Sequence, residues 1–230
     1  MYQINEFEQR HLLDEALADK VAAILSSAVK QKGKASIAVS GGSTPKGFFS
    51  ALSKKRLPWA QITITLADER WVDIDSNDSN TKLVHENLLQ NEAMNAKFFH
   101  LKQGSELTTE TLSDLNVAAT QQLLPLDVLI LGMGEDGHTA SLFPCSDEIS
   151  ECFLPDSAPL LKVVPKTAPH QRITFSFAAL AQSKNTILHI SGSSKKQVLA
   201  KAIAEHDIKE MPIRAFLHTD NINTQVYWAE

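Results

Sequence analysis

Asp127-Val-Leu-Ile-Leu-Gly-Met-Gly-Glu-Asp-Gly-His138 is a short apolar run that leads into a glycine-rich turn bearing acids and a histidine. A bounded run of branched aliphatic residues predicts a buried β-strand. Similar runs at 36–40, 62–66 and 186–190 also lead into glycine-containing or charged segments. Ligands of open α/β sheets bind beyond the carboxyl ends of the strands. These four segments therefore predict one shared ligand site.

Helical and strand-like segments alternate along the rest of the chain. Apolar residues at helical spacing predict a helix over about 12–31, and Gly33 ends it. We expect further helices over 45–52, 81–89, 108–123 and 195–204, and further strands near 98–101, 160–164, 173–177, Ala215 and Val226. The alternation predicts an α/β fold with a mostly parallel sheet flanked by helices. The length of 230 residues, 43% of them hydrophobic, favours a single domain over residues 1–230.

Composition and charge exclude several classes of function. The net charge is −5, and without a long basic run we expect no nucleic-acid partner. Two cysteines, Cys145 and Cys152, make neither a disulfide framework nor a zinc site. No signal peptide is visible, and no apolar run approaches the roughly 20 residues of a membrane span, so we expect no membrane association. The sequence predicts a cytoplasmic protein with no obligate protein partner.

The segment Gly41-Gly-Ser-Thr-Pro45 follows the strand at 36–40. Gly41 and Gly42 let the backbone approach a ligand, and Ser43 and Thr44 can cap the following helix. The free N–H groups at such a helix start predict an anion site. A capped helix with no ligand is the alternative reading of this segment alone.

Three cations lie at the ends of predicted elements. Arg172 stands at the start of one strand, and Lys195 stands at a strand-to-helix turn. Either one alone is typical of a solvated surface, but both could share an anionic ligand with the turn at 41–45. Asp68 and Arg70 follow the strand at 62–66, where they either face solvent or contact the polar part of a substrate.

His138 is the candidate general base. A histidine on a glycine-rich turn after a buried strand is well suited to take a proton near neutral pH, and Asp136 is close enough in sequence to influence it. The glycines at 132, 134 and 137 match a dinucleotide fingerprint, but Pro144 cuts short the helix that this motif requires. The acidic run at 73–84 has the wrong residues for a calcium loop. We therefore expect no cofactor and no metal.

Several motifs together resemble a known family. They are Ser40-Gly-Gly-Ser-Thr-Pro45, Asp68-Glu-Arg-Trp-Val72, Asp78-Ser-Asn80, Leu131-Gly-Met-Gly-Glu-Asp-Gly-His-Thr-Ala-Ser-Leu-Phe-Pro144, Pro165-Lys166, Arg172-Ile-Thr174 and Gly192-Ser-Ser-Lys195. In this order they resemble the bacterial 6-phosphogluconolactonase family of the glucosamine-6-phosphate isomerase/deaminase-like group. Gly137-His-Thr-Ala-Ser-Leu-Phe-Pro144 is the most specific of them, and Cys145 departs from the glycine that often follows the proline.

The resemblance implies a Rossmann-like sheet without a nucleotide. It implies hydrolysis of 6-phospho-D-glucono-1,5-lactone to 6-phospho-D-gluconate in the oxidative branch of the pentose phosphate pathway, without a cofactor. His138 would be the base that activates water, with either Asp68 or Asp136 orienting it. Ser43, Arg172 and Lys195 match phosphate-binding positions together with the Gly42 backbone, while Asp68 and Arg70 fall in the substrate site.

Two other functions fit parts of the pattern. A sugar-phosphate deaminase or isomerase of the same group carries a glutamate five residues after its histidine, where this chain has Phe143. An apolar ring cannot transfer protons, so the substitution favours the lactonase. A non-catalytic sugar-phosphate sensor would keep the anion-binding residues and lose the base, whereas His138 is present here.

Overall fold

A parallel sheet forms the centre of the computed structural model, which describes residues 1–230. Its strands are β1 (Tyr2–Phe7), β2 (Ala35–Val39), β3 (Ile62–Leu66), β5 (Lys97–Phe98), β6 (Val128–Leu131), β9 (Thr186–Ser191) and β10 (Thr224–Ala229). They lie in the order β1-β10-β9-β6-β2-β3-β5, and every neighbouring pair is parallel. All residues of β2 and β6 are buried, as expected for central strands covered on both faces.

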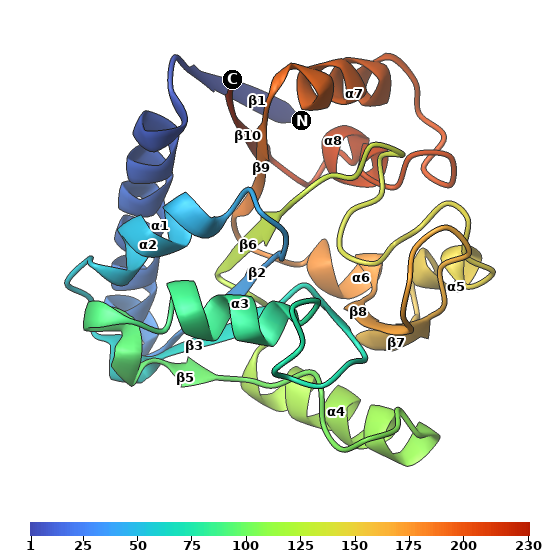
Figure 1. The fold of residues 1–230 in the computed structure, drawn as a ribbon, viewed down its shortest axis with the longest axis horizontal. Coiled ribbons are helices and arrows are strands. Elements are labelled where there is room, and N and C mark those ends of the chain that lie inside the picture. Colours follow the sequence, from blue (N-terminus) through green and yellow to red (C-terminus); the bar gives the residue numbers. More distant parts are fainter.

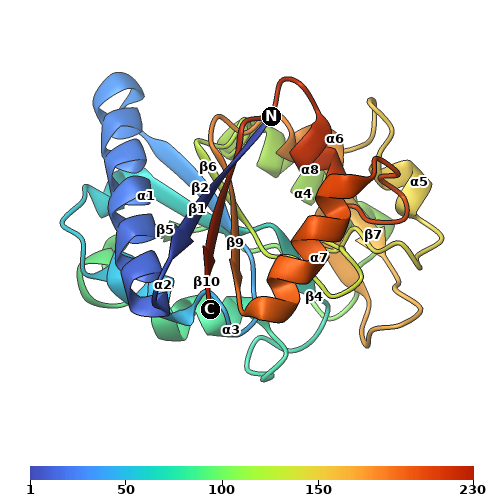
Figure 2. The same ribbon diagram turned by 90° about the horizontal axis from the view of Figure 1, so that it is seen from above.

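Helices cover both faces of this sheet (Figures 1 and 2). On one face lie α1 (Arg10–Lys32) and α2 (Lys46–Ser53), which pack against each other. On the other lie α7 (Ser193–Ala204) and α8 (Arg214–His218). The remaining helices are α3 (Asn80–Asn87), α4 (Thr109–Gln122), α5 (Ile149–Cys152) and α6 (Phe177–Leu180), with the 3₁₀ turns η1 (Trp59–Gln61) and η2 (Asn91–Asn95).

A second, antiparallel sheet adjoins the first. Its strands are β4 (Asp68–Arg70), β8 (Arg172–Phe175) and β7 (Leu160–Val163), in the order β4-β8-β7. The chain passes from β3 into β4 through the single residue Ala67, whose N–H donates to Val39 and whose carbonyl accepts from Phe175. Residues that follow β3 are thereby placed beside the start of β8.

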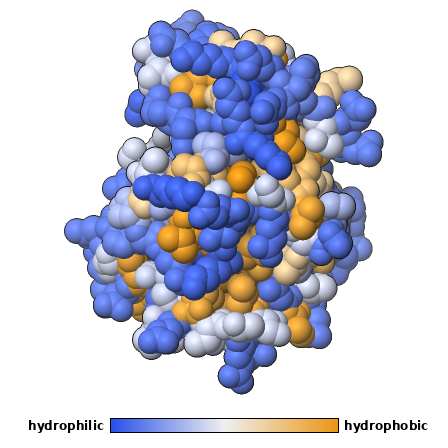
Figure 3. Space-filling model, turned by 90° about the vertical axis from the view of Figure 1, so that its right-hand side faces the viewer, coloured by the Kyte–Doolittle hydropathy of each residue, from blue (hydrophilic) through white to orange (hydrophobic).

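One hydrophobic core joins the two sheets. A cluster of 59 buried residues includes Leu129 of the parallel sheet and Ile173 of the antiparallel one. The outer face in Figure 3 is mainly hydrophilic, and its hydrophobic residues form small separate groups. No helix combines the length and the apolar character needed to cross a bilayer.

The predicted α/β fold with a mostly parallel sheet is confirmed. Gly33 ends α1 in the left-handed conformation, at φ 75°, and its N–H donates to the Val29 carbonyl. The strand predicted near Ala215 is wrong, because Arg214–His218 forms the helix α8. A short apolar run does not distinguish a buried strand from a buried helix, and four of these five residues are buried.

Candidate active site

The carboxyl ends of β2, β3, β6 and β9 open onto two adjoining hollows. The histidine hollow, about 180 Å³, is lined by Asp68, Arg70, His138 and Arg172. The lysine hollow, about 230 Å³, is lined by Ser43, Thr44, His189 and Lys195. Both are also lined by Ser40, Gly41, Gly42, Gly132 and Met133, so they form one continuous depression. All the residues expected to form the shared site line one or both hollows, except Asp136, which contacts His138 instead.

The turn at Gly134–His138 brings His138 back against Gly134, the residue with which the turn begins. The Gly134 N–H donates to the His138 carbonyl at 2.8 Å. A Cβ at Gly134 would lie 2.1 Å from His138 Nδ1 and 2.6 Å from Asp136 Oδ1. Only glycine leaves room for both side chains there, so this glycine serves the placement of His138.

Asp136 holds one nitrogen of that imidazole. Its Oδ1 lies 2.5 Å from His138 Nδ1 and also accepts from the His138 backbone N–H at 3.1 Å. Burial raises the pKa of the Asp136 carboxyl, but the hydrogen bond and charge of His138 outweigh burial and hold the pKa below its usual value. The carboxylate therefore stays ionised beside the ring, and the other nitrogen, Nε2, remains for a ligand.

Asp68 has a different partner. Its Oδ2 accepts from the Ser141 hydroxyl at 2.5 Å, and its carbonyl accepts from the Asn80 side chain at 3.0 Å. Asp68 is almost fully buried, yet it lines the histidine hollow. Of the two acids considered for orienting the base, Asp136 is the one hydrogen-bonded to His138.

Two guanidinium groups lie side by side in the histidine hollow. Arg70 and Arg172 are paired residues of the antiparallel strands β4 and β8. Arg70 donates to the Asp78 carbonyl at 2.6 Å, and Arg172 donates to the Pro169 carbonyl at 3.0 Å. In both side chains Nε is buried without a partner. Burial, which outweighs the nearby carboxylates, lowers the pKa of Arg172. Adjacent cations with unused donors suit an anionic ligand.

The turn at Gly41–Thr44 lines both hollows with backbone and hydroxyl groups. A Cβ at Gly41 would lie 1.8 Å from Asn80 Oδ1, so this glycine permits α3 to approach the turn. The backbone N–H groups of 41–44 have no acceptor within the chain. The expected capping role of Ser43 and Thr44 is wrong, because the cap position is Pro45 and no side chain bonds to the helix start. Both hydroxyls line the lysine hollow instead.

Lys195 approaches the lysine hollow from the first turn of α7. Its Nζ pairs with Glu135 Oε1 at 2.8 Å, and its side chain is 22% exposed. Glu135 belongs to the same turn as His138. The two hollows are therefore linked by an ion pair as well as by shared lining residues.

Glu69 was not predicted to contribute to the site. This buried carboxylate accepts from the N–H groups of Arg70, Asn80 and Thr81 at 2.7–2.8 Å. Burial raises the pKa of Glu69, against the opposing effect of these donors. The contacts anchor the start of α3, and with it Asn80, against β4. The only signal in the sequence was its place between Asp68 and Arg70, which both line the histidine hollow.

His189 was also missed, since it lies within an apolar strand. It is buried, lines the lysine hollow, and packs edge-on against Phe48. Burial lowers the pKa of His189 to about 4, so the ring is neutral near pH 7. Asp14 Oδ1 lies 3.8 Å away, and because the histidine is uncharged the contact is not an ion pair at neutral pH.

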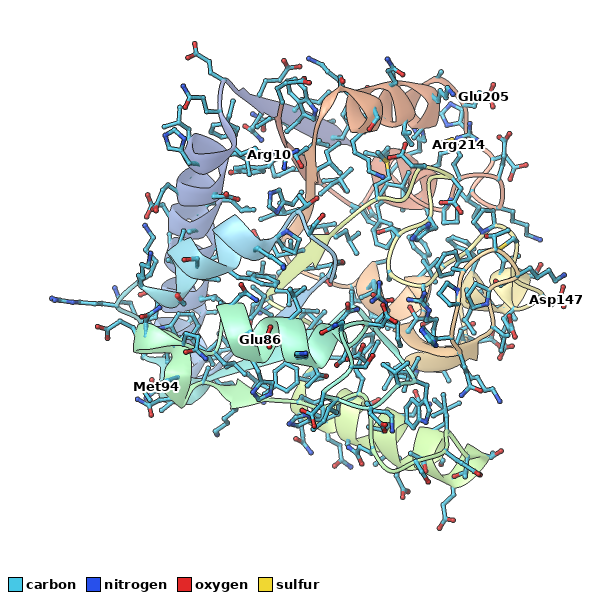
Figure 4. The ribbon with its side chains drawn as sticks, viewed as in Figure 1. Arg10, Glu86, Met94, Asp147, Glu205 and Arg214 are labelled. Carbon is cyan, nitrogen blue, oxygen red and sulfur yellow. The ribbon has the colours of Figure 1, made fainter.

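A buried arginine, Arg214, stabilises the segment that packs against the His138 turn. Arg214 is 2% exposed and pairs with Glu205 at 3.0 Å and with Glu210. Figure 4 shows Arg214 and Glu205 close together where α7 leads toward α8. The neighbouring Ile213 N–H donates to the Gly137 carbonyl at 2.9 Å. The ion pairs thus fix a segment against which the turn that bears His138 rests. No group of three or more His, Cys, Asp or Glu side chains is arranged to hold a metal ion.

Several known proteins are similar to this chain in sequence. Residues 8–228 match the model of the family described as glucosamine-6-phosphate isomerases/6-phosphogluconolactonase. A 6-phosphogluconolactonase of Rhizobium meliloti is 45% identical over 225 residues, covering 97% of each chain. One of Pseudomonas aeruginosa is 44% identical over 202 residues, covering 87% of this chain and 85% of the relative.

Solved structures agree with this grouping. A 6-phosphogluconolactonase from Shewanella baltica superposes with a TM-score of 0.97 at 41% identity, covering 100% of this chain and 98% of that one. A monomeric glucosamine-6-phosphate deaminase superposes with a TM-score of 0.80 at 19% identity, covering 99% of this chain and 97% of that one. The second likeness is one of fold alone.

Proposed function

The chain belongs to the glucosamine-6-phosphate isomerase/6-phosphogluconolactonase family, and from this premise we propose that it hydrolyses 6-phospho-D-glucono-1,5-lactone to 6-phospho-D-gluconate. This is the hydrolytic step of the oxidative branch of the pentose phosphate pathway. Relatives at 45% and 44% identity, and a solved structure at 41%, are 6-phosphogluconolactonases. The observation that carries the chemical proposal is the Asp136–His138 pair, which faces the same hollow as Arg70 and Arg172.

In this proposal the substrate phosphate binds where the two hollows meet. The unpaired N–H groups of 41–44, the hydroxyls of Ser43 and Thr44, and the Lys195 ammonium offer donors at the lysine hollow. Arg172 adds a guanidinium from the histidine side, with a buried Nε that has no partner. Donors of this kind suit phosphate oxygens. Anchoring the phosphate there leaves the lactone ring beside His138.

His138 then acts as the general base. Its Nε2 takes a proton from a water molecule as the water oxygen bonds to C1, and the carbonyl becomes a tetrahedral oxyanion. Collapse breaks the bond between C1 and the ring oxygen, and the imidazolium returns its proton to that oxygen. Asp136 holds Nδ1 and stabilises the imidazolium between these transfers. General base catalysis of this type contributes about 10²–10⁴-fold.

Arg70 completes the site as the oxyanion donor. Its buried Nε has no hydrogen-bond partner, and Arg70 lies opposite Arg172 across the antiparallel strands. A preorganised donor at a developing oxyanion is worth about 3–4 kcal/mol. Asp68, bonded to Ser141, lines the same hollow as the two arginines and His138 and is suited to contact the sugar hydroxyls.

The deaminase reading is the second candidate, because a deaminase shares the fold. Phe143 occupies the position where that family carries its glutamate, and its ring lies against His138. Since Phe143 supplies no proton donor or acceptor, ring opening of an amino sugar phosphate lacks its acid.

A paired assay tests the proposal. Purified protein is incubated with freshly generated 6-phosphogluconolactone, and acid release is compared with the spontaneous rate. A parallel incubation with glucosamine 6-phosphate is assayed for ammonia. We expect rapid acid release and no ammonia. Ammonia release would establish the deaminase instead, and lactone binding without turnover would indicate a sensor.

We also propose that one domain spanning residues 1–230 carries this activity in the cytoplasm. Residues from both sheets share one core and one site, which supports the single domain. Cys145 and Cys152 are free thiols, as is common in a reducing compartment.

A further inference from the structure

The ring of Phe143 contacts two groups of the proposed machinery at once. Its centroid lies 4.2 Å from that of the His138 imidazole, with 28° between the planes. The guanidinium carbon of Arg172 lies 5.6 Å from the same Phe143 centroid. His138 comes from the turn after β6, whereas Arg172 begins β8. One buried ring, 4% exposed, therefore connects side chains from two different sheets.

A tight chain reversal places Phe143 over His138. Thr139 and Leu142 form an isolated antiparallel bridge, and the Leu142 N–H donates to the Thr139 carbonyl at 3.0 Å. Ala140, between them, adopts a left-handed φ of 48° that favours glycine. The Ser141 N–H donates to Thr174 Oγ1 at 3.2 Å and ties the reversal to β8. Such unfavourable backbone conformations concentrate at functional sites.

A single hydrogen bond leaves the base incompletely fixed. The bond from Asp136 sets the direction of Nδ1, but the imidazole plane can still tilt about that direction. A stacked ring at 4.2 Å restricts the tilt and so controls where Nε2 points. The same ring offers its π-system to the Arg172 cation, whose Nε has no other partner.

We propose that Phe143 is a positioning residue that holds the imidazole plane of His138 and the guanidinium of Arg172 in one arrangement. The inference rests on the proposed function for its kinetic consequence only. A side chain that merely fills space could be replaced by another apolar side chain of similar volume. A stacking residue needs an aromatic face, and this difference separates the two roles.

Phe143→Leu and Phe143→Tyr are the informative variants. We expect Phe143→Leu to lower kcat for the lactone more than tenfold and to raise KM a fewfold, since the base and a phosphate donor lose their common support. Phe143→Tyr keeps the aromatic face and is expected to retain kcat within about threefold. Phe99→Leu is the matched control, because Phe99 is a buried aromatic residue that follows β5 and lines neither hollow. It is expected to leave kcat unchanged at temperatures where it is folded.

Nuclear magnetic resonance of the His138 ring protons gives a readout that needs no turnover. The ring current of Phe143 is expected to shift these protons upfield in the wild type and in Phe143→Tyr, and this shift is lost in Phe143→Leu. If Phe143→Leu does not fold, Phe143→Met, which also lacks an aromatic face, takes its place.

Wild-type kcat in a folded leucine or methionine variant would overturn the proposal. So would equal losses in the leucine and tyrosine variants, or His138 ring protons that do not respond to Phe143→Leu. If the wild type failed to hydrolyse the lactone, the proposed function would fall, and the ring-proton shifts would still decide whether Phe143 orders His138.

Discussion

The hydrogen bond between Asp136 and His138 decides which imidazole nitrogen is left free at the histidine hollow. Nδ1 is occupied by the carboxylate, so Nε2 is the atom available to take a proton. In the proposed mechanism the carboxylate also stabilises the positive charge that forms on the ring. A neutral side chain of the same shape would keep the contact and lose the charge.

Asp136→Asn is therefore expected to lower kcat about 10²-fold. The amide carries no charge to stabilise the imidazolium that forms in the proposed mechanism. The measurement is kcat for the lactone in the wild type and the variant at neutral pH.

Asp147→Asn is the matched control for this variant. Asp147 is an exposed acid near α5, at the right edge of the molecule in Figure 4, where it pairs with Lys166 and lines neither hollow. Its variant should reproduce the wild-type kcat. An unchanged kcat in Asp136→Asn would remove Asp136 from the mechanism.

Glu69 holds the start of the helix α3 in place and does not itself face the histidine hollow. Its carboxylate gathers three backbone N–H groups at the junction of β4 and α3. Through this junction Asn80 reaches the carbonyl of Asp68, and the segment at 73–80 meets Arg70 at the Asp78 carbonyl. Loss of the carboxylate would loosen one wall of the histidine hollow.

Glu69→Gln should lower the free energy of unfolding by about 1–3 kcal/mol, because the amide turns its NH₂ group toward backbone donors. Urea unfolding at neutral pH measures this change. Glu86 lies on the exposed side of α3 (Figure 4), and Glu86→Gln should keep the free energy of unfolding within about 0.5 kcal/mol of the wild type. Equal stability of the two variants would mean that Glu69 does not anchor α3.

The ion pair between Glu135 and Lys195 connects the His138 turn to α7. A phosphate at the lysine hollow competes with Glu135 for the same ammonium group. Glu135→Gln is therefore expected to lower KM for the lactone about two- to fivefold, since exposed pairs contribute up to about 1 kcal/mol. Inhibition by inorganic phosphate should strengthen by a similar factor. A raised KM would show instead that Glu135 holds Lys195 in its binding position.

Much of the architecture could be predicted from the chain. The apolar runs that became β2, β3, β6 and β9 are short and bounded by glycine or charge, so their burial in a parallel sheet follows from pattern alone. The convergence of the segments after them follows from parallel topology. For the same reason, the residues expected at the site line the two hollows, apart from Asp136.

Other features depend on contacts that leave no local pattern. β4 is a three-residue strand of Asp68, Glu69 and Arg70, whose pairing with β8 depends on where the rest of the chain goes. β1 alternates polar and apolar residues weakly and is set by its pairing with β10 at the other end of the chain. Which of the two acids, Asp68 or Asp136, is hydrogen-bonded to His138 could be decided only from interatomic distances in the structure.

At the scale of the whole molecule, His189 links stability to pH. Its pKa is about 4 in the folded protein because burial disfavours the charged ring, against about 6.5 for the unfolded chain. Between these values the unfolded state binds the proton and the folded state does not. The contribution of the uncharged His189 to the free energy of unfolding is therefore fully present above about pH 6.5, and it is lost as the pH falls toward 4.

We expect this histidine to reduce the free energy of unfolding by about 3 kcal/mol between pH 7.5 and pH 4. The measurement is urea unfolding at a series of pH values for the wild type and His189→Gln. The variant should show a shallower pH dependence over this range, whatever its stability at pH 7.5. Parallel curves would contradict the assignment of the pH dependence to His189.

The most direct test of the central claim is turnover of freshly generated 6-phosphogluconolactone by the wild type and by His138→Ala, with spontaneous hydrolysis subtracted. We expect fast turnover by the wild type and a loss of at least about 10²-fold in the variant, with the fold retained. A wild type no faster than the spontaneous reaction would contradict the lactonase function. A variant as fast as the wild type would contradict the role of His138 as the base.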